Sequence, residues 1–141
     1  MDAMIEHRRQ LIGEGLRALA NPVTLLYYTP DVASVSTRAE RELLEDVASA
    51  SDRIRLSVLA ELWDATRERE VGIAPTPAIV VRGETDPGIR YYGAPDGYEL
   101  GTFLAVIRAV SEGCSGLSEA SRAWVRELAD ARHLEVLVAP T

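Results

Sequence analysis

The segment Val23–Tyr28 constrains the fold most. It is a run of six strand-forming residues, in which Thr24 is the only polar residue before the two tyrosines at its end. Such a run is typical of a central strand that is covered on both faces. A loop and a helix follow, and Thr37 with Glu40 predicts a capping box at the helix start. Alternating apolar residues then predict a second strand over Ile54–Val58. A strand–helix–strand order predicts a right-handed crossover between two parallel strands.

The rest of the pattern adds an antiparallel pair and two helices. Ala78–Val81 reads as a buried strand and Ile89–Tyr92 as the returning arm of a hairpin. Asp96 and Glu99 repeat the cap spacing before an apolar helix, and a short polar helix or turn is expected over 63–72.

An amphipathic helix over residues 3 to 20 is predicted to precede the first strand, although Gly13 and Gly15 weaken it. Its apolar positions are Met4, Ile5, Leu11, Ile12, Leu16 and Leu19. The predicted fold class is therefore α/β: a four-stranded mixed sheet of order 2-1-3-4 with helices on both faces, which is the thioredoxin-like plan.

After Gly113 the pattern restarts with a linker, a helix that Ser118 can cap, and an apolar strand over His133–Thr141. A helix followed by an apolar strand repeats the opening of the chain. The repetition predicts the start of a second unit, whose first helix offers Trp124 and Leu128 for packing. We expect the last strand to pair, either on an exposed sheet edge or across a homodimer, because an unpaired apolar strand is a template for pairing.

Three segments, "NPVTLLYYT", "TPAIVV" and "GIRYYGAPDGYEL", resemble the N-terminal part of the two-unit glutaredoxin-like protein disulfide oxidoreductases. They are also similar to the N-terminal domain of the alkyl hydroperoxide reductase flavoprotein subunit. The resemblance implies a thioredoxin-like unit with an extra N-terminal helix over 1–113, with its core at 22–113. Residues 114–141 would then open a second unit, whose first strand leads into a Cys-x-x-Cys motif in these families.

The first unit departs from the redox pattern, because the loop "TPDVASVS" after its first strand contains no cysteine. A dithiol site needs one sulfur to attack and another to resolve the mixed disulfide. Cys114, the single cysteine, excludes an internal disulfide and a cysteine-based zinc site. It falls in the linker without a nearby base, so an inert thiol is preferred over a reactive one. We therefore assign no catalytic residue and leave enzymatic activity open.

The resemblance implies a cis peptide between Thr76 and Pro77, facing the loop that carries the cysteines in relatives. In those proteins this peptide exposes the preceding backbone to an extended partner segment. The simpler alternative is a trans proline that starts a strand. Gly93, Pro95 and Gly97 form the turn that carries the most specific part of the resemblance. For Asp96 and Glu99, helix capping is preferred over a general acid/base pair.

Charge and composition exclude several other classes. The formal net charge of -7 argues against nucleic-acid binding. No apolar run approaches the roughly 20 residues that span a bilayer, and "MDAMIEHRRQ" does not read as a secretory signal, so a cytoplasmic location is expected. His7 and His133 have no partner at metal-ligand spacing, and we assign neither a metal nor a cofactor.

Two functions remain, apart from a less favoured non-redox enzyme on the same fold. The first is a redox-inactive unit of a thiol-disulfide oxidoreductase, which contributes to cell redox homeostasis by docking an adjoining active unit or a protein thiol/disulfide partner. The alternative is a stand-alone peptide or protein interaction module without a redox role.

Overall fold

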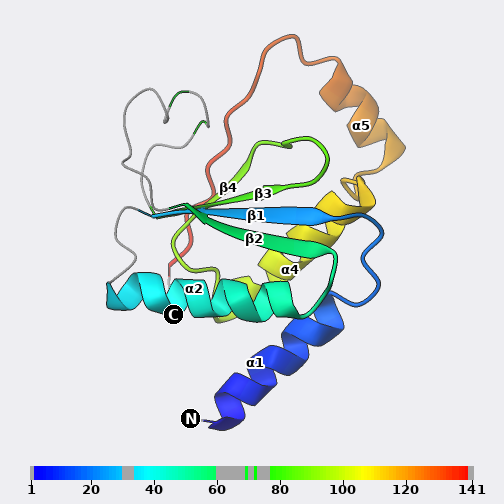
Figure 1. The fold of residues 1–141 in the computed structure, drawn as a ribbon. Coiled ribbons are helices and arrows are strands. Elements are labelled where there is room, and N and C mark those ends of the chain that lie inside the picture. The colour runs from blue at the N-terminus through cyan, green and yellow to red at the C-terminus, as the bar shows by residue number, and fades with distance from the viewer. Residues whose placement is uncertain (1, 30–33, 60–68, 70–71, 73–76, 140–141) are drawn as a thin grey trace.

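The computed structural model describes residues 2–29, 34–59, 69, 72 and 77–139 (Figure 1). The bounds of its elements are α1 Asp2–Gly15, β1 Val23–Tyr28, α2 Val35–Ser49, β2 Ile54–Leu59, β3 Ala78–Arg82, β4 Ile89–Tyr92, α4 Tyr98–Glu112 and α5 Glu119–Arg126. The helix or turn predicted over 63–72 lies almost entirely outside the described residues.

The strands form one mixed sheet of order β2-β1-β3-β4, which confirms the predicted topology. The crossover through α2 makes β1 and β2 parallel, with Leu25 opposite Leu56. On its other side β1 pairs antiparallel with β3, where Leu25 lies opposite Val81. The hairpin then pairs β3 with β4. β1 is thus an inner strand, as its unbroken apolar sequence predicts.

Helices lie on both sides of the sheet: α1, α2 and α4 on one side and α5 on the other (Figure 1). The main core fills the space between the sheet and the first three helices. Its most deeply buried large side chains are Tyr27, Phe103, Ile12, Leu16, Leu25, Leu43, Leu44, Ile79, Ile107, Val23 and Val47. A smaller cluster of Tyr28, Ala78 and Val80 forms a second core group. Among the described helices, none has the length and apolar character that a membrane crossing requires.

The first helix ends at Gly15, five residues earlier than predicted. One further backbone hydrogen bond, from Leu16 N to Ile12 O, carries the chain into the turn that precedes β1. A Cβ atom at Gly15 would lie 2.9 Å from Leu104 Cδ1, so glycine lets α1 approach α4 closely. The predicted apolar stripe is only partly buried. Ile12, Leu16 and Leu19 join the core, whereas Met4, Ile5 and Leu11 are exposed.

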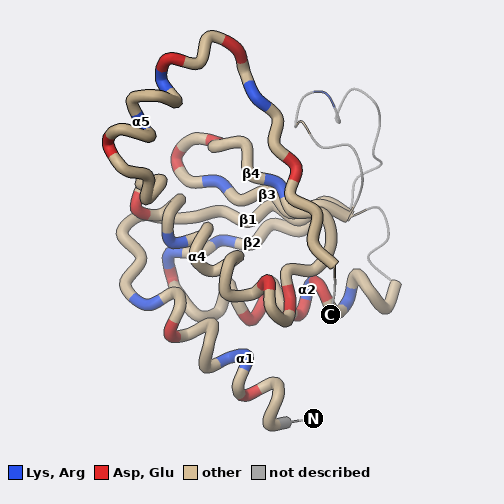
Figure 2. The backbone as a smooth tube through the Cα atoms, turned by 180° about the vertical axis from the view of Figure 1, so that it is seen from behind, with Lys and Arg blue, Asp and Glu red and all other residues tan. Residues whose placement is uncertain are grey.

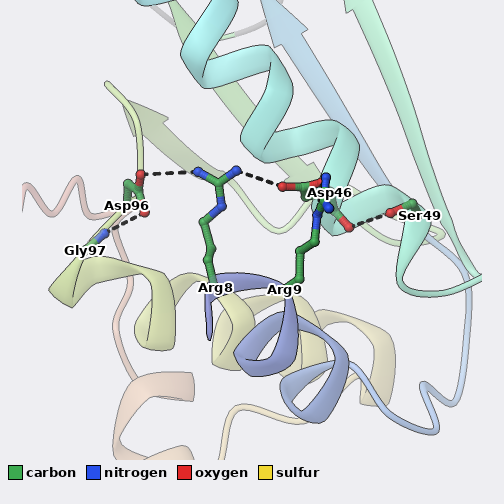
Figure 3. A network of polar contacts seen from close by, with 6 residues as sticks. All are labelled: Arg8, Arg9, Asp46, Ser49, Asp96 and Gly97. Carbon is green, nitrogen blue, oxygen red and sulfur yellow. Dashed lines mark hydrogen bonds and ion pairs between the residues drawn. The ribbon is translucent and has the colours of Figure 1, made fainter. Parts of the chain in front are cut away.

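Two arginines attach α1 to the neighbouring elements (Figure 3). Arg8 Nη2 lies 2.7 Å from Asp46 Oδ2 on α2, and Arg8 Nη1 lies 3.8 Å from Asp96 Oδ2 in the turn before α4. Arg9 Nε approaches the other Asp46 oxygen at 3.2 Å. A single guanidinium thereby contacts carboxylates from two separate parts of the fold, which fixes the orientation of α1.

Asn21 and Ser111 form a further polar connection, named here the clasp. The Asn21 backbone N–H donates to Ser111 Oγ at 2.9 Å, and the Asn21 side-chain amide donates to the Ser111 carbonyl at 2.9 Å. The Ser111 hydroxyl donates in turn to the Asn21 carbonyl at 2.7 Å. This clasp joins the chain just before β1 to the last turn of α4.

Both predicted helix caps are wrong in position. The cap of α2 is Ser34, whose Oγ accepts a hydrogen bond from Thr37 N at 3.2 Å. Thr37 is therefore already inside the helix. The cap residue of α4 is Gly97, with φ of 60° and no side-chain cap bond, whereas Asp96 accepts a hydrogen bond from Gly97 N and pairs with Arg8.

The C-terminal tail, residues 129–139, does not form the predicted strand in the structure. Ser118 caps α5 as expected, since its Oγ accepts from Ser121 N at 3.1 Å. Beyond α5 the described chain has neither helix nor strand, and Leu134, Val136, Leu137 and Val138 are all exposed. Trp124, predicted as part of an anchor, is 65% exposed. The predicted division into a complete and an incomplete unit stays a prediction.

Candidate partner-binding site

One end of the sheet brings together the segments from which the sequence predicts a binding site. Tyr28, the last residue of β1, lies opposite Ala78, the first residue of β3. Ala78 in turn lies opposite Tyr92, the last residue of β4. Pro77 directly precedes Ala78 and is half-buried at this end of the sheet. Thr76 lies outside the described residues, so the cis peptide stays a prediction.

A buried group of hydroxyls and one carboxyl lies where β1 passes into α2; its members, named here the polar cluster, are Tyr27, Thr29, Ser34, Thr37 and Glu40. The Tyr27 hydroxyl donates a short hydrogen bond to Glu40 Oε2. Thr29 Oγ1 lies 3.4 Å from Thr37 Oγ1, and Ser34 Oγ donates to Thr37 Oγ1 at 2.7 Å. The cluster thus connects the last part of β1 with the first turns of α2.

Burial controls the chemistry of this cluster. Tyr27 is fully buried, and Glu40 is only 8% exposed. Loss of solvation raises the pKa of Tyr27 well above its ordinary value, and the hydrogen bond and negative charge of Glu40 raise the pKa further. Tyr27 therefore stays protonated at neutral pH and acts as a hydrogen-bond donor. The cluster contains no thiol, and its groups satisfy one another, as buried polar groups require.

Cys114 lies far from the polar cluster. Cys114 lies just beyond α4, and its N–H donates to the Ala109 carbonyl within that helix. It follows Ser111 by three residues, and Ser111 is bound to Asn21 just before β1. The cluster occupies the other end of β1, and a six-residue strand is roughly 20 Å long. The Cys114 side chain is exposed. The only sulfur nucleophile of the chain is therefore at the wrong end of the sheet for dithiol chemistry at the cluster.

Two exposed apolar side chains flank the same end of the sheet. Val35, the first residue of α2, is 83% exposed, and Tyr92 at the end of β4 is 49% exposed. The half-buried Pro77 precedes Ala78, which lies opposite Tyr92 in the sheet. An exposed valine and tyrosine around a strand end provide apolar contact area for a bound polypeptide.

The predicted turn residues shape the neighbouring loop. Gly93 and Gly97 adopt positive φ angles of 103° and 60°, which favour glycine, and Pro95 is buried between them. This turn connects β4 to α4 and also positions Asp96 for Arg8. The predicted motif residues are thus structural. Among the residues that the structure describes, no group of three or more potential ligands could hold a metal ion.

The polar cluster is the part of the site that sequence reasoning missed. The sequence predicts a capping pair for Glu40 and Thr37, and it places Tyr27 only within a covered strand. A glutamate at the apolar stripe position of a helix, four residues from Leu44, was the available signal for a buried carboxyl. Its partner could not be identified, because Tyr27 belongs to a different element.

No protein-family model matches the sequence, and no curated protein matches it either. Solved structures do match the fold. The NTD_N/C domain of alkylhydroperoxide reductase AhpF from Enterococcus faecalis superposes with a TM-score of 0.71 at 22% identity, over 84% of this chain and 57% of that chain. A C503A mutant of AhpF from the same organism superposes with a TM-score of 0.73 at 23% identity, over 87% of this chain and 60% of that chain.

A protein disulfide oxidoreductase from Aeropyrum pernix K1 also gives a TM-score of 0.73 at 22% identity, over 87% of this chain and 54% of that chain. The chain therefore spans little more than half of the length of these structures. Identities this low establish the fold alone. The fold is thioredoxin-like, and its structural neighbours are the proteins that the sequence resembles.

Proposed function

We propose that the chain is a redox-inactive thioredoxin-like unit that binds a protein at the sheet end around Thr29, Val35 and Pro77. The partner is either a protein thiol or disulfide, or an adjoining active thioredoxin-like unit. The observation that carries this proposal is the polar cluster itself. It occupies the junction between β1 and α2 with hydroxyls and a carboxyl, and these groups cannot exchange disulfides.

The structural neighbours support the redox context, because one is a protein disulfide oxidoreductase and another is a domain of a peroxide reductase subunit. Fold likeness does not fix function, so the site itself must carry the argument. The exposed Val35 and Tyr92 favour a second candidate, a stand-alone peptide-binding module. Both functions use the same surface and differ in the partner.

A titration followed by NMR distinguishes the two candidates. Isotope-labelled chain is titrated with a purified dithiol thioredoxin and, separately, with an extended apolar peptide. We expect shifts of the Thr29, Ala78 and Tyr92 amides with the thioredoxin under the first function, and with the peptide alone under the second.

Val35→Glu is expected to weaken either interaction, because it replaces an exposed apolar side chain of the proposed surface with a charged one. Val125→Glu is the matched control, since Val125 is also exposed but lies on α5. Shifts confined to other surfaces, or an equal effect of both variants, would contradict a binding site at this end of the sheet.

A further inference from the structure

The C-terminal tail carries a strand-like apolar stripe that has no covering. Leu134, Val136, Leu137 and Val138 are 88%, 85%, 93% and 58% exposed. His133 Nε2 lies 2.9 Å from Glu135 Oε1, so these two side chains point to the same side. Side chains two residues apart share a face in extended backbone. Leu134, Val136 and Val138 then form the opposite, apolar face. Contiguous exposed apolar side chains of this kind mark an interaction surface.

A matching edge exists on the same molecule. β2 is an outer strand of the sheet within the part of the chain that the structure describes. Ile54, Leu56 and Val58 point from β2 toward the main core, and the last two are only partly buried. Arg55 lies on the other face and is exposed, with no ion pair among the described residues. An open edge with partly covered apolar residues accepts a further strand.

The tail and β2 are complementary in a parallel register. The aligned residues are Leu134 with Ile54, Glu135 with Arg55, Val136 with Leu56, Leu137 with Ser57 and Val138 with Val58. This register places the apolar triplet of the tail beside the apolar triplet of β2. It also places opposite charges side by side on the other face. Apolar alternation and cross-strand charge pairs both determine the register of a sheet. The new strand pair would continue the parallel arrangement of β1 and β2.

The other outer strand fits less well. β4 has four residues, against six for β2. Its cation, Arg90, is already held by both oxygens of Asp86, at 2.9 Å and 2.6 Å. Arg90 is therefore not available to a glutamate of the tail in the way that Arg55 is.

The tail lies away from β2 of its own chain. It runs behind the sheet in Figure 1, where β2 forms the front edge, and in front of the sheet in Figure 2. We therefore propose that residues 133–138 add as a fifth strand to β2 of a second copy of this chain, and that the exchange is reciprocal. A two-fold symmetric dimer follows, because each copy offers both the strand and the edge. This dimer is independent of the partner-binding site described above.

Sedimentation equilibrium of the full chain tests the proposal through a charge swap. Glu135→Arg alone and Arg55→Glu alone place like charges side by side twice per dimer. Each is expected to raise the dimer dissociation constant roughly tenfold. The double variant restores opposite charges and is expected to return to the wild-type value. Glu127→Arg is the control, because this exposed carboxylate lies at the end of α5, outside the proposed strand.

Disulfide trapping identifies which chain receives the strand. In a Cys114→Ser background, one copy carries Glu135→Cys and another carries Arg55→Cys. The proposal expects a covalent heterodimer only when the two are mixed, since directly opposed residues lie within disulfide reach. In a single chain that carries both cysteines, the link is expected to be predominantly intermolecular.

Several results would overturn the proposal. The first is a wild-type chain that stays monomeric at millimolar concentration. The second is a double charge variant whose dimer dissociation constant is raised by the sum of the two single effects. The third is a disulfide that forms within one chain.

Discussion

Tyr27 shows how one buried hydroxyl sets the character of the candidate site. It lies at the last inward position of β1, where its ring packs in the main core and its hydroxyl reaches Glu40 on α2. A carboxyl this deeply buried needs a donor, because an unpaired buried charge is costly. The Tyr27–Glu40 bond therefore connects the last part of β1 with the first turns of α2.

Tyr27→Phe is expected to destabilise the fold by about 1–3 kcal/mol, because it leaves the Glu40 carboxyl without its donor while the ring packing persists. Urea unfolding measures the change, and Tyr92→Phe, at a half-exposed tyrosine, is the control with little effect. The pKa of Tyr27 is raised in the folded state, so its contribution is complete below pH 10 and is lost as the pH rises further. Because Tyr27→Phe has no phenol to ionise, its stability should fall less than that of the wild type as the pH rises above 10. Equal stability of wild type and Tyr27→Phe would contradict the structural role of the bond.

A second residue-scale prediction concerns the hairpin loop. Hydrogen bonds from Arg90 lower the pKa of Asp86 below its ordinary value of 3.8. Its stabilising contribution is therefore complete above that value and is lost as the pH falls through the lowered pKa. Asp86→Asn should remove this acid dependence and cost less than about 1 kcal/mol, because the pair is partly exposed. The measurement is the free energy of unfolding of the wild type and of Asp86→Asn between pH 2 and pH 6. Glu84→Gln, a carboxyl-to-amide change in the same loop, is the matched control variant.

At the scale of elements, α1 is attached to the fold by ion pairs as well as by apolar contacts. Its first two turns expose Met4 and Ile5, and its deeply buried residues begin at Ile12. Between these regions Arg8 bridges α2 and the turn before α4 (Figure 3). The ion pairs of α1 therefore come from two arginines, of which only Arg8 also reaches Asp96.

Arg8→Ala is expected to destabilise the fold by about 1–2 kcal/mol and to increase hydrogen exchange in the first half of α1. The reason is that Asp96 loses its contact with α1, while Asp46 keeps only Arg9. Arg8→Lys should restore little of the lost stability, because a single ammonium group cannot contact both carboxylates as the two guanidinium nitrogens do. Arg41→Ala, which removes an exposed pair with Glu45, should cost about 0.3–0.5 kcal/mol. An Arg8→Ala variant no less stable than Arg41→Ala would show that apolar contacts alone hold α1.

The four strands of the sheet were predictable because their signals are local: the apolar run of β1, the alternation in β2 and the turn formers before β4 are all contained within their segments. The apolar tail has a similar local signal but forms no strand in the described residues. The helix starts were not predictable. Ser34 and Thr37 are equally suitable caps by residue type, and Ser34 is the cap because Thr37 is drawn into contact with Thr29. Similarly, Asp96 is turned toward Arg8, 88 positions earlier in the chain. Contacts between distant elements decide such positions, and a single sequence does not display them.

At the scale of the whole molecule, a thioredoxin-like fold carries a polar cluster without a thiol. The sheet order is β2-β1-β3-β4, and the cluster at the β1–α2 junction consists of hydroxyls and one carboxyl. The only cysteine lies near the start of β1, beyond the end of α4.

We expect no dithiol reductase activity from this chain, because one cysteine cannot both attack a disulfide and resolve the product. The measurement is insulin reduction followed by turbidity, with dithiothreitol as the electron donor. Wild type and Cys114→Ser should both give the rate of the reductant alone. Turnover that depends on Cys114 would contradict the proposed inactivity.

The Asn21–Ser111 clasp has a mechanical consequence. Everything before Asn21 and everything after Ser111 lies outside the strands, and three hydrogen bonds join these two points directly. Tension applied between the two ends of the chain therefore enters and leaves the sheet-bearing region at a single junction. The clasp and the packing of α1 against α4 bear the load first, and the strand pairs are shielded until that junction ruptures.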